Sequence, residues 1–170
     1  MNKENSENKN KEVKHFKRFA REWAMQFLFQ YDLSSDTIDL DEALDSFLKQ
    51  LTDQELYKTA PNSKIQKKAA KTTKELIQGF LENKEFIDEK IASFSTKWTI
   101  DRMNIVDRNI MRVAAYEMLF CNNIPPIVSI NEAVEIGKIF GTVNSAAFIN
   151  GILNSLKDTL DRPAREAVSE

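Results

Sequence analysis

The first helical stretch of the sequence carries a row of basic side chains that suits contact with nucleic acid. Residues 14–32 have apolar side chains at intervals of three and four, which predicts a helix with one buried stripe. A helical wheel places four basic residues on the opposite face, namely Lys11, Lys14, Arg18 and Arg21. Met25 and Phe29 continue this face toward the helix end. Because cations engage phosphates and a ring stacks on an unpaired base, the pattern indicates RNA binding, with a solvated helix face as the alternative.

Charge is unevenly distributed along the chain, although the formal net charge is only −2. Residues 1–21 hold seven Lys and Arg against three Glu, a balance of +4, so the remaining residues sum to −6. This asymmetry predicts a basic arm that meets a polyanion while the rest of the protein has another task.

The residue types that most often carry catalysis are scarce. The chain has one histidine, His15, one cysteine, Cys121, and no glycine-rich phosphate loop. A nucleophile with its base, or a cluster of metal ligands, therefore has little to be built from. We expect a protein that is not an enzyme and that uses no cofactor and no metal ion.

Composition favours one helical domain that stays inside the cell. The 170 residues are 42% hydrophobic, which is enough for a core, and only four glycines and four prolines argue against frequent turns. No apolar run approaches the roughly 20 residues that span a bilayer, and the polar start lacks the features of a signal peptide. The single cysteine fits a reducing compartment. We expect an all-α, cytoplasmic protein without a membrane segment.

Periodicity and turn signals divide the chain into seven helical stretches between a polar arm and a short tail. The arm is residues 1–13, the helical domain is 14–162, and the tail, 163–170, is expected to fray. The expected helices cover residues 14–32, 39–51, 63–81, 84–94, 104–119, 129–140 and 145–160.

Several single residues have expected structural roles. Asn104 is expected to begin one helix, and Ser129 with Glu132 matches a capping box that would begin the next. Gly141 is expected to end that helix in a left-handed conformation, and Gly151 to allow a close helix approach. Two residues are expected in the core: Glu117, as a hydrogen-bonded structural carboxylate, and Trp98, as a plug beneath the C-terminal helices.

Phe148 lies off the centre of the last apolar stripe. Its position is compatible with the edge of the core or with an exposed stacking ring, and periodicity alone favours the core edge.

Three blocks near the C-terminus resemble a known family. They read I-V-D-R-N-I-M-R-V-A-A-Y-E-M-L, I-P-P-I-V-S-I-N-E-A-V-E-I-G-K-I-F-G and S-A-A-F-I-N-G-I-L. In this order and spacing they look like the transcription antitermination factor NusB family, and A-R-E-W-A-M-Q-F-L-F-Q-Y-D-L-S in the first helix extends the likeness. It is weakest over residues 37–94, where only helical periodicity supports it. NusB-like domains also occur fused to ribosomal RNA methyltransferases, but the absence of a cofactor-binding half favours a stand-alone factor.

The resemblance implies an all-α fold of about seven helices in two packed sub-bundles. It also implies a function without catalysis. Members of this family bind the boxA element of nascent RNA, pair with the ribosomal protein NusE, and join RNA polymerase in antitermination complexes, notably on ribosomal RNA operons. A helical module that binds only protein, or that forms a homodimer without binding RNA, is the alternative.

The resemblance also implies roles for individual residues. The arginine-rich first helix of the family falls on Lys17, Arg18 and Arg21, and a position where the family often has another basic residue is Phe19 here. The phenylalanine of the F-[VI]-N-G motif, which is associated with the RNA surface, falls on Phe148. Where the family usually carries acidic residues, this chain has Thr142-Val143-Asn144, and losing that charge at Asn144 should strengthen RNA contact. Asp107 matches an acidic position associated with the NusE partner.

Overall fold

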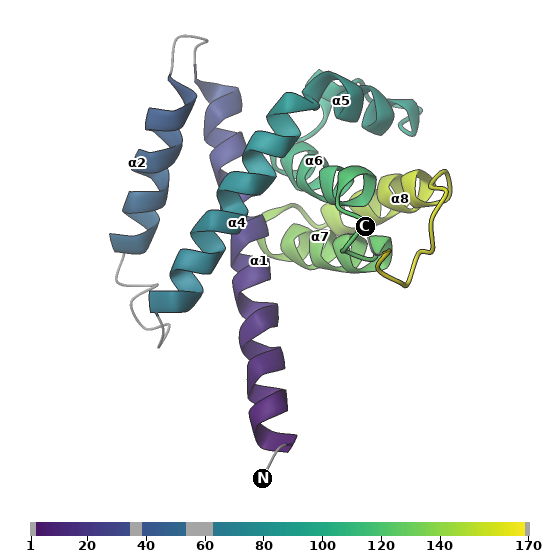
Figure 1. Cartoon of the computed structure of the whole chain (residues 1–170). Helices are drawn as coiled ribbons and strands as arrows, with labels where there is room; N and C mark the ends of the chain where they lie inside the picture. The colour runs from purple at the N-terminus through teal and green to yellow at the C-terminus, as the bar shows by residue number, and fades with distance from the viewer. Residues whose placement is uncertain (1–2, 35–38, 54–62, 169–170) are drawn as a thin grey trace. The chain divides into compact units, whose positions relative to one another are not determined.

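The computed structural model describes residues 3–34, 39–53 and 63–168, and the side chains of residues 16–34, 39–51 and 65–168. These residues form seven α-helices and one 3₁₀ turn, with no strand among them (Figure 1). The elements are α1 (Lys3–Leu33), α2 (Leu40–Asp53), α4 (Ser63–Glu82), α5 (Lys84–Ser93), the 3₁₀ turn η1 (Ile100–Arg102), α6 (Ile105–Phe120), α7 (Pro126–Phe140) and α8 (Ser145–Lys157). The all-α expectation is therefore confirmed. None of the described helices combines the length and apolar character that crossing a membrane requires.

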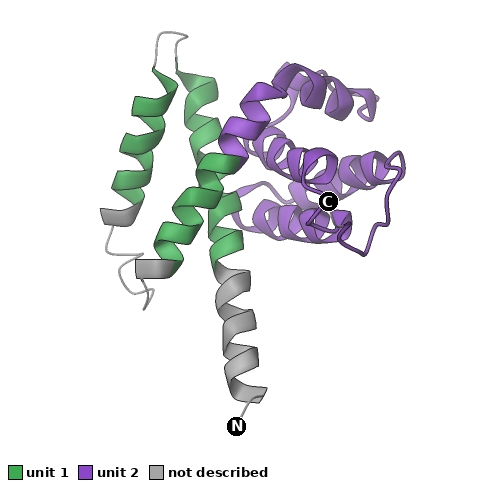
Figure 2. Cartoon of the chain, viewed as in Figure 1, with its two compact units in different colours: residues 1–75 green, residues 76–170 purple. Residues whose placement is uncertain are grey.

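The helices separate into two compact units, residues 1–75 and residues 76–170 (Figure 2). Helix α4 begins in the first unit and ends in the second. The expected division into two sub-bundles is confirmed.

In the first unit, α1 is covered by both α2 and α4. The ring of Phe27 meets Phe47 of α2 edge to face at 5.4 Å between centroids. On α4, the Thr73 hydroxyl donates to the backbone carbonyls of Ala20 (3.3 Å) and Ala69 (2.7 Å). The polar atom of this buried side chain is therefore hydrogen-bonded. Helix α1 therefore has partners on more than one side.

Helix α1 also begins earlier than expected. It starts at Lys3, so the predicted start at Lys14 is wrong. Packing holds the later turns of α1 as a helix, and adding turns to an existing helix avoids the cost of nucleation. The side chains of residues 3–15, including Lys11 and Lys14, lie outside the described residues.

In the second unit, a buried ion pair joins α5 to α6. The Arg112 guanidinium donates to both carboxylate oxygens of Asp88 at 2.7 Å, and it also donates to Asn109 Oδ1 at 3.0 Å. Its Cζ atom lies 5.3 Å from the centroid of the Phe80 ring at the end of α4. Since Arg112 is 3% exposed and Asp88 is 8% exposed, these protein contacts replace most of the water that would otherwise surround the two charges.

Helix α7 packs on α6 through a second buried polar contact. Ser129 Oγ donates to Glu117 Oε2 at 2.8 Å, and both side chains are buried, which agrees with the structural role expected for Glu117. The capping-box prediction is wrong, because α7 begins at Pro126 and Ser129 lies one turn inside it. Proline suits the first helical turn, where its missing N–H costs no hydrogen bond.

The glycines act differently from expectation. Gly141 has φ −91°, so it is not a left-handed cap. A Cβ at Gly151 would meet nothing within 4 Å, whereas one at Gly137 would lie 2.7 Å from Ile149 Cδ1. The tight contact with α8 is therefore at Gly137, where the end of the Ile149 side chain fills the space next to the glycine, and not at Gly151.

Residues 163–168 are held to the body of the second unit, so the prediction of a frayed tail is wrong for them. Arg162 donates to the last carbonyls of α6, with Nη2 2.7 Å from Met118 O and 3.3 Å from Glu117 O. Backbone hydrogen bonds from Ile127 to Ala164 (3.0 Å) and from Val168 to Asn122 (2.9 Å) continue the attachment. A cation at a helix C-terminus satisfies carbonyls that have no partner within the helix.

We expect the Asp88→Asn substitution to lower the free energy of unfolding by about 3–5 kcal/mol, because it removes the carboxylate charge that both hydrogen bonds of the buried Arg112 guanidinium meet. Urea denaturation followed by circular dichroism measures the change. The matched control is Asp45→Asn, which breaks the exposed Lys74–Asp45 pair (3.2 Å) and should cost less than about 1 kcal/mol. Equal losses in the two variants would show that the buried pair has no special importance.

Candidate nucleic-acid interface

The residues predicted to bind RNA fall into two groups, one on α1 in the first unit and one in the second unit. On α1 the side chains of Lys17, Arg18 and Phe29 are half-buried, so each keeps part of its surface in contact with solvent. Lys14, which belongs to the same prediction, lies outside the described side chains.

Two other residues expected on the exposed face of α1 are buried. Arg21 is 5% exposed and Met25 is 3% exposed, so their assignment to a solvent-facing basic surface is wrong. Between residues 20 and 28, the buried positions are Ala20, Arg21, Trp23, Ala24, Met25, Phe27 and Leu28. At 3.6 residues per turn they cover an arc of roughly 200°. The wheel assumed one narrow apolar stripe, but a helix with several packing partners buries more than half of its circumference.

The second group gathers around one groove. Asp107 at the start of α6, together with Asn144 and Phe148 at the start of α8, lines an open groove of about 470 Å³. Its other lining residues are Trp98, Arg102, Met103 and Asn104. Three residues that are far apart in the sequence, and that were predicted separately, therefore share one site.

Hydrogen bonds at the starts of α6 and α8 order the backbone around this groove. Asn104 Oδ1 accepts hydrogen bonds from the N–H groups of Val106 (2.9 Å) and Asp107 (3.4 Å), which confirms Asn104 as the cap of α6. At α8, Ser145 Oγ accepts from the N–H of Thr142 at 2.7 Å and thereby ties down the loop after α7. This hydrogen bond orders residues 142–145, and therefore the position of Asn144.

Asp107 lies at the floor of the groove instead of on the open surface. It is 5% exposed, and its Oδ1 has no hydrogen-bond partner among the described residues. Desolvation by burial raises the pKa of Asp107 above 3.8, and a hydrogen bond from Ser145 opposes part of that rise. Any group that contacts this carboxylate must enter the groove.

Trp98 is a groove residue that the sequence misassigned. It was expected to plug the core, but it is 49% exposed and lines the groove with Phe148. The available signal was its polar surroundings, since Lys97 and Thr99 flank it in a connection between helices where no periodicity places it in the core.

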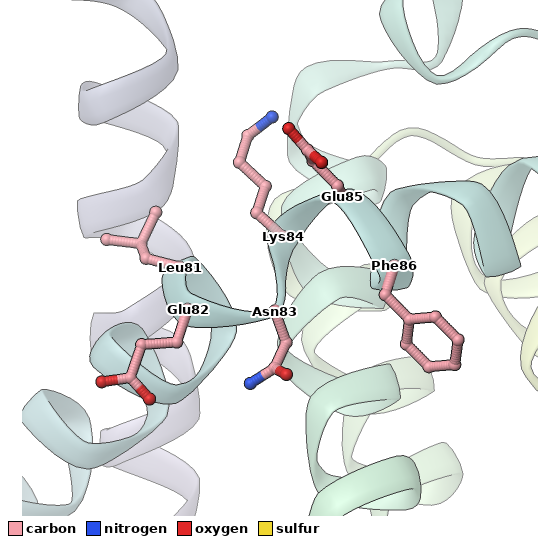
Figure 3. Close-up of a pocket in the computed structure, with 6 residues that line it drawn as sticks. All are labelled: Leu81, Glu82, Asn83, Lys84, Glu85 and Phe86. Carbon is pink, nitrogen blue, oxygen red and sulfur yellow. The ribbon is translucent and has the colours of Figure 1, made fainter.

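A second hollow lies at the corner between α4 and α5, where the side chains of residues 81–86 diverge (Figure 3). Asn83 Nδ2 donates to Gly79 O at 2.9 Å, and Lys84 Nζ pairs with Asp88 at 3.2 Å. The exposed ring of Phe86 contacts Phe120 edge to face at 6.2 Å. These contacts show that the corner is a junction between two helices, and it holds none of the residues predicted to bind RNA.

We expect the Asp107→Asn variant to be more stable than the wild type at neutral pH and to lose this advantage below pH 3.8. Because the folded-state pKa is raised, the folded wild type binds more protons than the unfolded chain between the two pKa values, so its stability falls as pH rises through that window. Urea titrations across the acid range measure the difference between the two proteins. The control, Asp101→Asn, removes an exposed carboxylate from the neighbouring turn and should show no such gain; a pH-independent difference for Asp107→Asn would contradict the assignment.

The chain matches the NusB family model over residues 18–158. The transcription antitermination protein NusB of Bacillus thuringiensis (strain Al Hakam) is 40% identical over 153 residues, which cover 85% of this chain and 98% of that protein. The same protein from Bacillus anthracis (strain CDC 684 / NRRL 3495) gives equal values. Among solved structures, T. maritima NusB is 37% identical with a TM-score of 0.67, covering 84% of this chain and 90% of that one.

A structure of the antitermination factors NusB and NusE in complex with double-stranded RNA is 21% identical, with a TM-score of 0.69 over 86% of this chain and 98% of that one. At this identity the likeness concerns the fold alone. The family model and the relatives at 40% identity rest on the sequence itself and cover most of it. The chain belongs to the NusB family.

Proposed function

We propose that this protein is a cytoplasmic transcription antitermination factor that binds boxA-like RNA together with the ribosomal protein NusE and supports transcription of ribosomal RNA. Family membership carries the proposal: relatives that match most of the chain are named transcription antitermination proteins. A NusB–NusE pair with RNA has been solved on the same fold, which supports the choice of partners.

The chemistry of the two groups of residues is suited to single-stranded RNA. Lys17 and Arg18 supply cations for phosphates, while Phe29 and Phe148 supply partly exposed rings for bases. Asn144 adds an exposed amide, which is able to donate to and accept from a base edge.

Catalysis is no part of the proposal. The only histidine and the only cysteine, His15 and Cys121, are far apart in the sequence, and no glycine-rich phosphate loop occurs. The protein acts instead by bringing RNA and a partner protein into the RNA polymerase complex.

NusE would meet an acidic surface. Glu85 and Glu89 on α5 are exposed, and a basic protein is attracted to such carboxylates. The contact between Asp107 and NusE that the resemblance implies stays a prediction.

Gel filtration and electrophoretic mobility shift with the full chain, purified NusE and labelled boxA RNA test the proposal. A complex containing all three components is the expected result. A homodimer that ignores both RNA and NusE would support the alternative of a protein-interaction module and would overturn the proposal.

We expect the Lys17→Ala/Arg18→Ala double variant to bind boxA RNA more weakly and with less dependence on salt. Each lost phosphate contact should reduce the slope of log K against log salt concentration by about 0.7 for a single strand. Titrations at several salt concentrations provide the slope. The matched control, Lys67→Ala/Lys71→Ala, removes two exposed cations from α4 in the same unit and should change the slope less. Equal slopes in both double variants would contradict the prediction that Lys17 and Arg18 on α1 contact RNA phosphates.

Arg21→Ala is unsuited to this comparison, because Arg21 is buried and its loss would disturb the fold as well as any RNA contact.

We expect Phe148→Ala to weaken RNA binding by about 1–3 kcal/mol, the usual value of one base stacked on an aromatic ring. Fluorescence anisotropy with labelled RNA measures the loss, and thermal unfolding checks that the fold is intact. An unchanged affinity in a folded variant would return Phe148 to the edge of the core.

A further inference from the structure

Trp98 is a large side chain that lines the groove with half of its surface in solvent. At 49% exposure it contributes little to the core. Among the described residues, no aromatic ring stacks on it. Phe148, which is half-buried, lines the same groove from the start of α8. Two partly exposed rings therefore converge on one groove from different elements.

The backbone that carries Trp98 is ordered by hydrogen bonds. The Trp98 N–H donates to Ser95 Oγ at 3.1 Å, and the N–H of Arg102 donates to Thr99 O at 3.0 Å. Arg108 Nη1 donates to Ile100 O at 3.1 Å, which attaches this connection to α6. A ring presented on such a backbone loses little conformational freedom when a ligand stacks on it.

The polar groups around the rings match the parts of a nucleotide. Arg102 is an exposed cation that lines the groove, and Lys97, which precedes Trp98 in the sequence, is also exposed. Asp101 is an exposed carboxylate in the same connection. The Oδ1 of Asn104 is used to cap α6, which leaves its amide N–H groups as donors. Asn144 is exposed and makes no side-chain capping bond, so its amide is available to a base edge. Beneath the groove, the buried Asp107 carboxylate places a negative charge close to the ligand.

We propose that Trp98 and Phe148 together form a stacking groove for one base of single-stranded RNA, with Lys97 and Arg102 on the side of its phosphate. This inference rests on the proposed function, and it adds Trp98 as a residue that determines RNA affinity. The negative charge of the buried Asp107 carboxylate disfavours a phosphate inside the groove, so the base enters the groove and the RNA backbone remains outside. A volume of about 470 Å³ lies within the range of small-ligand pockets.

The first test compares affinities of full-length variants, in the presence of purified NusE, for labelled single-stranded boxA RNA. Trp98→Ala should weaken binding about 5- to 150-fold, whereas Trp98→Phe, which keeps a ring, should recover most of the affinity. Phe86→Ala is the matched control, because Phe86 is 47% exposed in the same unit but lies outside the groove, and it should change affinity by less than about twofold.

The second test locates the stacked base. RNAs with one abasic position each are titrated against the wild type and Trp98→Ala. At the position whose base stacks on Trp98, the abasic change and the substitution should be non-additive, since both remove the same interaction. RNA should also quench tryptophan emission in the wild type and lose this effect in Trp98→Phe, where Trp23 is the remaining tryptophan of the two.

The outcomes separate the inference from the function on which it rests. If Lys17→Ala/Arg18→Ala weakens RNA binding but Trp98→Ala behaves like Phe86→Ala, the stacking groove is overturned and the proposed function stands. If Trp98→Ala weakens binding of NusE alone and leaves RNA affinity unchanged, the groove is a protein contact and the inference is again overturned. If the wild type with NusE binds no RNA, both fall.

Discussion

The second unit depends on one buried ion pair. Arg112 on α6 reaches Asp88 on α5 with two hydrogen bonds of 2.7 Å, and its guanidinium lies over the Phe80 ring at the end of α4. Removing two charges from water is costly, so such a pair is weak evidence of net stability. The pair does constrain how α5 and α6 lie against each other, because both hydrogen bonds form only when the two helices have one particular relative position.

Helix α6 carries one side of the groove and is held by contacts at its start, middle and end. Its start is capped by Asn104, its middle is joined to α7 through Glu117 and Ser129, and Arg162 closes its last carbonyls. The groove that holds Asp107 and Trp98 therefore lies at the fixed end of a helix that is anchored along its length. An RNA base that entered it would meet side chains already in position, and less of the interaction energy would be lost to ordering them.

Hydrophobic periodicity describes one helix at a time and does not show how many neighbouring helices cover it. Arg21 and Met25 appeared solvent-facing on a wheel drawn for one apolar stripe, yet α1 has both α2 and α4 on its surface. The sequence predicts Trp98 in the short connection before α6 as a core plug, but no helix covers the ring there and it is half exposed. Ser129 fitted a capping box, and the proline at the start of α7 moved the helix boundary by one turn.

The sequence by itself determined the helical class, most helix boundaries within a few residues, the Asn104 cap and the resemblance to the NusB family. These features depend on neighbours along the chain, where side-chain spacing and capping act directly. Only the tertiary structure decided that Arg21 is buried, that Gly137 rather than Gly151 allows helix contact, and that Trp98, Asp107, Asn144 and Phe148 share one groove. Each of these depends on which helix faces which, and the pattern along a single helix does not specify its partners.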